Sequence, residues 1–138
     1  MKIKLVLPKQ YFEYDSQVRP MLESALKHGH QENDYTHWLA LVLTYQAQLW
    51  VITSEDNKVA GTLITRINTY SNYKSLQVVL LAGFNFKSWV HLYSEVEAFA
   101  KANECKKVEQ WGRIGWTKLL PRLINGFKPS YQVMTKDI

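Results

Sequence analysis

LQVVLLA-GFNFKS-WVHLYSEVEAFAKA, residues 76–102, is the stretch that decides the fold of this chain. Residues 76–82 are apolar apart from Gln77, which predicts a central strand that is covered on both faces of a sheet. In residues 89–102 the apolar side chains recur at three- and four-residue spacing, which predicts a helix with one buried face. A strand that leads through a helix to another strand predicts two parallel neighbours in one sheet.

Outside this stretch, the sequence alternates between strand-like and helix-like patterns. We expect strands at 3–7, 49–53, 59–67, 76–82, 107–111 and 127–134. We expect helices at 16–28, 35–45, 89–102 and 116–123. This order predicts an α/β or α+β fold, in which residues 1–138 form one domain. The sheet is expected to be mixed, mostly antiparallel and of about six to seven strands, with helices on both faces.

The composition is typical of one compact globular domain: the chain has 138 residues, of which 46% are hydrophobic and 21% charged. No apolar run is long enough to cross a bilayer, and the N-terminus has no secretory apolar region, so we expect a soluble protein without a membrane partner. The net charge is +5, but no run of basic residues exceeds two, so we expect no nucleic-acid partner. The single cysteine, Cys105, excludes an intramolecular disulfide.

The element order and several short motifs resemble a known family. The motifs are Gln48–Val51, Val59–Gly61, Ala102–Cys105, Gly112–Trp116 and Gly126-Phe127. They look like the small proteins of the GCN5-related N-acetyltransferase (GNAT) fold that tailed phages and prophages encode, often described as internal virion or morphogenesis proteins. The resemblance implies a GNAT-like fold over nearly the whole chain. It also implies a location in the cytoplasm of a bacterial host or in the virion.

The junction between the central strand and its helix departs from the pattern of active GNAT members. Active members have an Arg/Gln-x-x-Gly-x-Gly/Ala loop here, whose backbone N–H groups hold the pyrophosphate of coenzyme A, because glycine lets the backbone approach an anion. In this chain the junction at 83–88 has a single glycine, Gly83, with Phe84 and Phe86 close to it. We therefore favour a non-catalytic protein without a cofactor. It would act through contacts with a protein partner in virion assembly, or as a minor virion component.

The alternative is an acyl-CoA-dependent N-acyltransferase that moves an acetyl group from acetyl-CoA to an amine and has a divergent pyrophosphate loop. In such a mechanism, strand amides polarise the thioester carbonyl and the start of the following helix holds the phosphates. The resemblance implies these roles for Leu81, Ala82, Gly83, Phe86, Lys87 and Ser88.

Catalytic side chains are difficult to assign from the family pattern. The usual acid of the family is a tyrosine shortly before the Gly-Phe pair, and counting back from Gly126 places Arg122 there. Tyr131 follows the pair on the expected last strand, and Glu109 is the carboxylate that the fourth and fifth strands offer as a base. Glu109 and Tyr131 are therefore the catalytic candidates. For Glu109, an exposed strand position is the simpler interpretation.

The motif WGRIGW at 111–116 is unusual in combining two tryptophans with an arginine. Its glycines indicate a turn, and the arginine needs water or an acidic partner, so we do not expect full burial. Trp111, Arg113 and Trp116 could form an aromatic and cationic contact surface for a protein partner. Equally, Trp116 could attach the following helix to the sheet. Exposed tryptophans are also compatible with a homodimer.

Side chains that can bind metals gather where the first helix ends, at His28, His30, Glu32, Asp34 and His37. Their spacing matches no ligand template, and helix ends and caps commonly carry such residues. We therefore expect no metal site.

Overall fold

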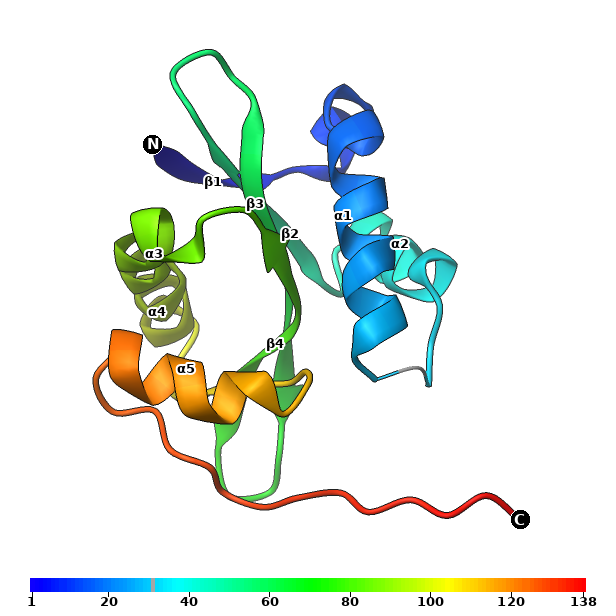
Figure 1. The fold of residues 1–138 in the computed structure, drawn as a ribbon, viewed down its shortest axis with the longest axis vertical. Coiled ribbons are helices and arrows are strands. Elements are labelled where there is room, and N and C mark those ends of the chain that lie inside the picture. Colours follow the sequence, from blue (N-terminus) through cyan, green and yellow to red (C-terminus); the bar gives the residue numbers. More distant parts are fainter. Residues whose placement is uncertain (31) are drawn as a thin grey trace.

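The computed structural model describes residues 1–30 and 32–138, and Figure 1 shows the fold as a ribbon. The strands are β1 (Lys2–Val6), β2 (Gln48–Thr53), β3 (Val59–Thr69), β4 (Lys74–Gly83) and β5 (Cys105–Gln110). The α-helices are α1 (Asp15–His28), α2 (Tyr35–Leu43), α3 (Phe86–Trp89), α4 (Tyr93–Ala102) and α5 (Gly115–Leu123). Two 3₁₀ turns, η1 (Pro8–Glu13) and η2 (Val90–Leu92), precede α1 and α4.

The five strands form one mixed sheet in the order β1-β2-β3-β4-β5. The first three neighbouring pairs are antiparallel, and β4 and β5 are parallel. The parallel pair encloses α3 and α4, as the strand-helix-strand pattern predicts. The predicted fold class, a mixed and mostly antiparallel sheet with helices on both faces, is confirmed.

The predicted number of strands is wrong, because residues 127–134 form no strand. Phe127 is half-buried and its ring lies 5.8 Å from that of Tyr93, centroid to centroid, so it packs on the helical layer. Pro129 then removes a backbone donor that a strand would need. Residues 128–138 are exposed and extended, and Figure 1 shows them leaving the sheet.

Two separate apolar cores lie on the two faces of the sheet. In Figure 1, α1 and α2 cover one face, while α3, α4 and α5 lie on the other. The first core includes Val18 and Leu22 of α1 with Trp38 of α2. The second core includes Trp89 and Val96. All five side chains are 2% exposed or less, so both faces of the central strands are shielded from water.

Strand β4 changes its environment halfway along its length. Lys74–Val78 pair with β3 on one side and with β5 on the other. The pairing with β5 stops there, whereas the pairing with β3 continues to Gly83. Val79 is an extra residue in the β3–β4 ladder, since Val78 faces Thr65 and Leu80 faces Ile64. Such a bulge bends the strand and increases its twist.

The helix predicted at 89–102 begins earlier and is interrupted. It starts at Phe86, passes through η2 and resumes at Tyr93. Trp89, where the break occurs, has φ −129° and ψ 3°, outside the helical region. Among the helices of the described residues, none is long and apolar enough to cross a membrane.

Candidate functional site

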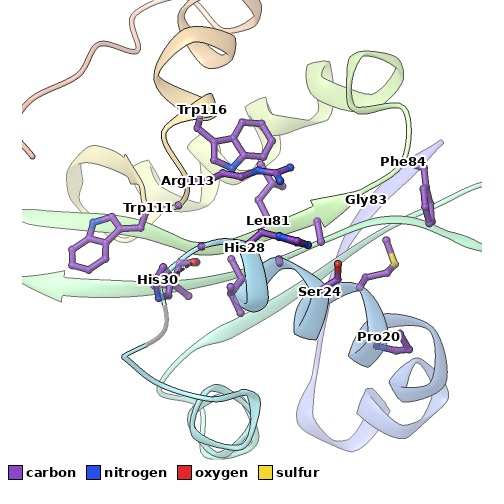
Figure 2. A pocket seen from close by; sticks show the side chains of 17 residues that line it. Pro20, Ser24, His28, His30, Leu81, Gly83, Phe84, Trp111, Arg113 and Trp116 are labelled. Atoms are coloured by element: carbon purple, nitrogen blue, oxygen red, sulfur yellow. Dashed lines mark hydrogen bonds between the residues drawn. The ribbon is translucent and has the colours of Figure 1, made fainter. Parts of the chain in front are cut away.

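A cavity of about 340 Å³ opens where β4 and β5 diverge. The backbone N–H of Trp111 donates to the Val78 carbonyl at 3.0 Å, and beyond this contact the two segments separate. Figure 2 shows side chains from three segments around this space. They come from α1 and its end (Pro20, Met21, Ser24, Ala25, His28, Gly29 and His30), from Val79–Phe84, and from Trp111–Arg113 with Trp116.

The β4 wall of the cavity is an open strand edge. Neighbouring residues of an extended strand direct their N–H and C=O groups to opposite sides, and only the β3 side of Val79–Gly83 has a strand partner. The edge therefore presents backbone donors and acceptors to the cavity. These groups are the usual means of holding an extended polar ligand along a sheet.

His30 occupies the point where the strands part. Its Nε2 is 2.8 Å from the carbonyl oxygen of Val79, the bulge residue, and its Nδ1 is 3.5 Å from Oε2 of Glu32. The ring also makes edge contacts with Trp38 and Trp111, with centroids 6.2 and 6.3 Å apart. Both ring nitrogens therefore face oxygen atoms. His30 thus links the end of α1 to the bulge.

His28, Ser24 and Arg113 supply the other polar side chains of the cavity. All three are exposed. Among the described residues, the His28 ring and the Arg113 guanidinium have no hydrogen-bond or ion-pair partner. In Figure 2, His28 comes from α1 and Arg113 from the segment after β5, so they reach the same space from two sides.

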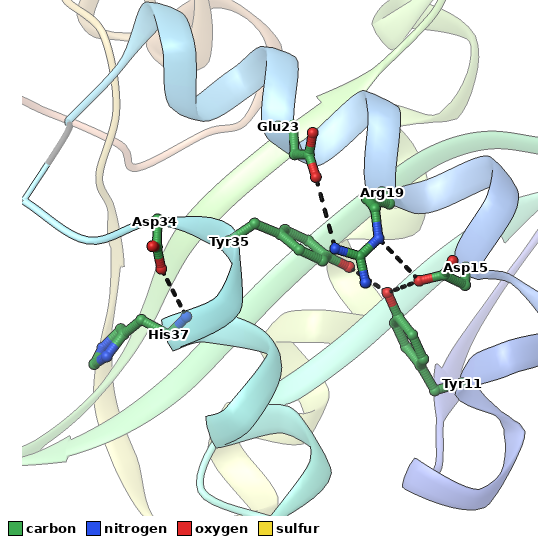
Figure 3. A network of polar contacts seen from close by, with 7 residues as sticks. All are labelled: Tyr11, Asp15, Arg19, Glu23, Asp34, Tyr35 and His37. Carbon is green, nitrogen blue, oxygen red and sulfur yellow. Dashed lines mark hydrogen bonds and ion pairs between the residues drawn. The ribbon is translucent and has the colours of Figure 1, made fainter.

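A polar network positions the helix that forms this wall, and Figure 3 shows it. The Tyr11 hydroxyl donates to Asp15 and lies 2.7 Å from the Tyr35 hydroxyl. Nε of Arg19 donates to Asp15 at 3.2 Å, and the guanidinium lies 4.8 Å from the centre of the Tyr35 ring. These contacts join η1, α1 and α2. By helical spacing they lie on the flank of α1 opposite to Ser24 and His28.

The network shifts the pKa values of its members in opposite directions. The hydrogen bond from Tyr11, together with the positive charge of Arg19, lowers the pKa of Asp15 below its usual 3.8. Burial and the hydrogen bond to Asp15 raise the pKa of Tyr11 well above its usual range. Burial likewise raises the pKa of Tyr35. At neutral pH the network therefore consists of two neutral phenols, a carboxylate and a guanidinium.

The loop after β4 is held in place by Trp89, which packs closely against the backbone of two strands. The indole N–H of Trp89 donates to the Phe84 carbonyl at 2.8 Å. A Cβ on Gly61 would lie 2.5 Å from the Trp89 ring, and one on Gly83, where φ is +152°, would lie 2.5 Å from the Ala60 carbonyl oxygen. Asn85 has φ 51°, in the left-handed region. The indole thus fits against two glycines on neighbouring strands.

The phenylalanines of this loop do not fill the cavity. Phe84 is 68% exposed and lies at its rim. Phe86 turns to the second core, where its ring meets those of Trp89 and Trp116 at 4.8 and 5.2 Å. Lys87 and Ser88 are exposed at the start of α3. The space between β4 and the segment after β5 therefore stays open.

The structure separates the residues that the sequence singled out. Trp111, Arg113 and Trp116 line the cavity together with Leu81, Ala82 and Gly83. Glu109 does not line it, and instead accepts a hydrogen bond from the Tyr70 hydroxyl at 3.0 Å. Tyr131 is 74% exposed in the C-terminal segment. Arg122, at the position of the family's usual acid, is exposed on α5 and outside the cavity lining.

Sequence reasoning missed two residues of the cavity, His28 and His30. It weighed them only as metal ligands, and the signal that could have found them is their position at the C-terminal end of a helix that packs on the central strand. The residues 1–30 and 32–138 contain no group of three or more His, Cys, Asp and Glu side chains arranged to hold a metal ion.

Several solved structures that resemble this chain in fold are named as acetyltransferases. No protein-family model matches the chain, and no curated protein does. A probable acetyltransferase matches with a TM-score of 0.74 and 9% identity, over 100% of this chain and 98% of the other. Ribosomal-protein-alanine N-acetyltransferase from Brucella melitensis matches with a TM-score of 0.68 and 14% identity, over 99% of this chain and 100% of the other. A GNAT family acetyltransferase from Staphylococcus aureus matches with a TM-score of 0.68 and 16% identity, over 99% of this chain and 98% of the other. At such identities the likeness shows the fold alone, and the chain has the GNAT fold.

Proposed function

We propose that this protein is an acyl-CoA-dependent N-acyltransferase whose reaction takes place in the cavity between β4, α1 and the segment after β5. The observation that carries the proposal is the open edge of Val79–Gly83 along a cavity that no loop side chain fills. The GNAT fold supports it, because several of the matched solved structures are named as acetyltransferases. The sequence favoured a non-catalytic protein, and the open cavity favours the alternative.

The acyl donor lies along the open edge of β4. Its pantetheine arm carries amides, which pair with the backbone groups of Leu80–Gly83 that have no strand partner, as an added strand would. A backbone N–H near Leu81 donates to the thioester carbonyl oxygen and stabilises the negative charge that develops there. The protein thus contributes fixed donors rather than a charged side chain at the reacting carbonyl.

The acceptor amine approaches from the α1 side. Its nitrogen attacks the thioester carbonyl carbon, so that a C–N bond forms, the C–S bond breaks and sulfur leaves as the thiolate of coenzyme A. His28 accepts the proton that the amine nitrogen loses, because its ring has no other partner among the described residues. No tyrosine lines the described cavity, so water protonates the thiolate.

The phosphates of coenzyme A lie at the start of α3. Exposed Lys87 supplies a positive charge there, and Ser88 a hydroxyl. The hydroxyl donates to the Asn85 carbonyl at 2.7 Å in the structure, so binding phosphate through it would require that bond to break. Gly83 is the only residue of this loop without a side chain, so only there can a phosphate come close to the backbone. We therefore expect weaker pyrophosphate binding than a loop with repeated glycines provides.

Isothermal titration calorimetry with acetyl-CoA tests this function. The proposal predicts binding at micromolar to millimolar concentration. It also predicts a severalfold loss of affinity in Lys87→Gln, which removes one phosphate contact. Lys101→Gln is the matched control, since Lys101 is an exposed lysine at the far end of α4. Absence of heat at millimolar acetyl-CoA would remove the basis of the proposal.

Exposed apolar side chains beside the cavity favour a second candidate function. Phe84 and Ile114 are 68% and 73% exposed, and Trp111 is 39% exposed. Such residues suit a contact surface for a protein partner or for a second copy of the chain. The phage resemblance makes a virion component the partner to test. Detection in purified phage particles, a concentration-dependent mass in sedimentation and no acetyl-CoA binding would together favour this candidate.

A further inference from the structure

The charge of the cavity restricts what it can accept. The described residues that line it include Arg113, His28 and His30, and no aspartate or glutamate. The carboxylate of Glu32, which contacts His30 at 3.5 Å, does not line the cavity. An acceptor with several cationic groups would therefore find no countercharge here. An acceptor with a negative group would find an arginine.

Arg113 has the geometry to recognise a carboxylate. A guanidinium is a permanent cation whose parallel N–H groups match the two oxygens of a carboxylate. Among the described residues no carboxylate or hydrogen-bond acceptor engages it. His28 faces the same space from α1 (Figure 2). One ligand could therefore place a carboxylate at Arg113 and an amine toward His28.

Apart from Ser24, the rest of the lining is apolar, aromatic or glycine. Met21 and Ala25 form the α1 side, Leu81 the strand side, and Trp111 and Trp116 the third side. The cavity of about 340 Å³ lies near the lower end of the range of small-molecule sites, roughly 300–1,000 Å³. With the thioester end of the donor along β4, this volume leaves room only for a small acceptor with a compact apolar body.

We propose that the acceptor is a small amino acid with an apolar side chain, held by its carboxylate on Arg113 while its amine is acylated. This inference rests on the proposed function for the acylation step. The carboxylate preference itself is a property of the cavity, so it can be measured without an acyl donor.

The experiment compares ligand pairs that differ only in the carboxylate: L-leucine with 3-methylbutylamine, and L-phenylalanine with 2-phenylethylamine. Calorimetric titrations are run on the full chain, alone and with millimolar coenzyme A. We expect each amino acid to bind about tenfold more tightly than its amine in at least one of these states. Arg113→Gln should abolish this preference.

Arg122→Gln is the matched control, since Arg122 is an exposed arginine outside the cavity. It should keep the full preference. Arg113 is also exposed, so both variants should melt at the wild-type temperature. Equal binding of amino acid and amine in both states, or an unchanged preference in Arg113→Gln, would overturn the inference.

Release of the coenzyme A thiol, measured with the same four compounds and acetyl-CoA, separates the two proposals. Acylation of the free amines as fast as the amino acids would contradict the carboxylate preference and leave the acyltransferase standing. An Arg113-dependent preference without acetyl-CoA binding would support the carboxylate site and contradict the acyltransferase. Faster acylation of the amino acids, lost in Arg113→Gln, supports both.

Discussion

The two halves of β4 share one strand and have opposite surroundings. Lys74–Val78 are paired on both sides, and Leu76, Gln77 and Val78 are 0% exposed. Val79–Gly83 are paired with β3 alone and border a cavity. Residues 79–82 are all apolar, whereas Lys74, Ser75 and Gln77 of the first half are polar. The difference in pairing comes from where β5 ends, and it leaves only the second half able to offer its backbone to a ligand.

We call Lys74–Val78 the closed half of β4 and Val79–Gly83 the open half. The closed half shows how a buried polar side chain finds hydrogen-bond partners. The buried side-chain oxygen of Gln77 accepts from Arg66 at 2.6 Å and from Asn68 at 2.8 Å. These side chains satisfy an acceptor that water cannot reach. In the open half, backbone groups can remain unpaired because the cavity admits solvent or a ligand. The candidate site thus lies along the half of the strand that β5 leaves unpaired.

Gly83→Ala should have the largest effect on the free energy of unfolding, because it inserts an atom where the open half of β4 packs closely against β3. The added Cβ would lie 2.5 Å from the Ala60 carbonyl oxygen and 2.7 Å from Cα of Gly61, at a φ of +152°. Both contacts are backbone, so neither can move easily. We expect a loss of about 3 kcal/mol in the free energy of unfolding.

Chemical denaturation measures this loss. Gly115→Ala is its control, since a Cβ at Gly115 meets nothing within 4 Å. That variant should stay within about 0.5 kcal/mol of the wild type. If the two alanine variants were equally stable, the close packing of the loop against β3 would be wrong.

His28→Asn tests whether the open half is a reaction site. Asparagine keeps a polar side chain but cannot accept the proton of the acceptor amine. We expect the rate of acyl transfer to fall about a hundredfold with little change in the KM for acetyl-CoA. The control His91→Asn changes an exposed histidine on η2, outside the cavity, and should leave the rate unchanged. An undiminished rate in His28→Asn would remove His28 from the mechanism.

Tyr11→Phe should weaken the network that holds the α1 wall. It removes a hydroxyl that contacts Asp15 and Tyr35, at an expected cost of about 1–2 kcal/mol near neutral pH. The hydrogen bond lowers the pKa of Asp15 below 3.8, so its contribution is present above that pH and is lost as the pH falls through the lowered value.

The stability difference between wild type and Tyr11→Phe should therefore shrink as the pH falls below about 3.8, as measured by denaturation over a pH series. Tyr70→Phe, which removes an exposed hydroxyl bonded to Glu109, should cost far less. A Tyr11→Phe difference that stayed constant down to strongly acidic pH would contradict the link to Asp15.

Glu109→Gln should have the smallest effect. Glu109 lies on β5 beside the closed half, bonded to Tyr70 at 3.0 Å, and does not line the cavity. We expect an acyl-transfer rate within about twofold of the wild type, because the substitution removes charge only outside the reaction site. A tenfold fall would return Glu109 to the catalytic candidates and weaken the division of β4 into two halves.

The sequence was sufficient to predict the central elements of the fold. The apolar run at 76–82 lies within β4 (Lys74–Gly83), because burial on both faces requires a continuous apolar segment. The amphipathic run after it forms α3 and α4, because burial of one helix face imposes three- and four-residue spacing. The strand predicted at 127–134 is absent, since alternation alone does not supply a strand partner. The bulge at Val79 could not be predicted, because residues 78–82 are all apolar and their pattern shows no break there.

The candidate site was harder to predict, because it depends on tertiary placement. The cavity exists because β5 pairs with only half of β4, and no local pattern encodes where that pairing ends. Trp111 and Arg113 were expected on an outer contact surface, and the turn after β5 brings them to the cavity. His28 reaches it because α1 packs along β4. In the sequence, His28 had been weighed only as a metal ligand, and its spacing matched no ligand template.

Backbone amide NMR during a titration with acetyl-CoA tests the central claim most directly, because each half of β4 reports separately. The account predicts that the largest shifts occur at Val79–Gly83 and around Lys87, while Lys74–Val78 barely move. Saturating shifts centred on the closed half or on α2, or no shifts at millimolar acetyl-CoA, would contradict it.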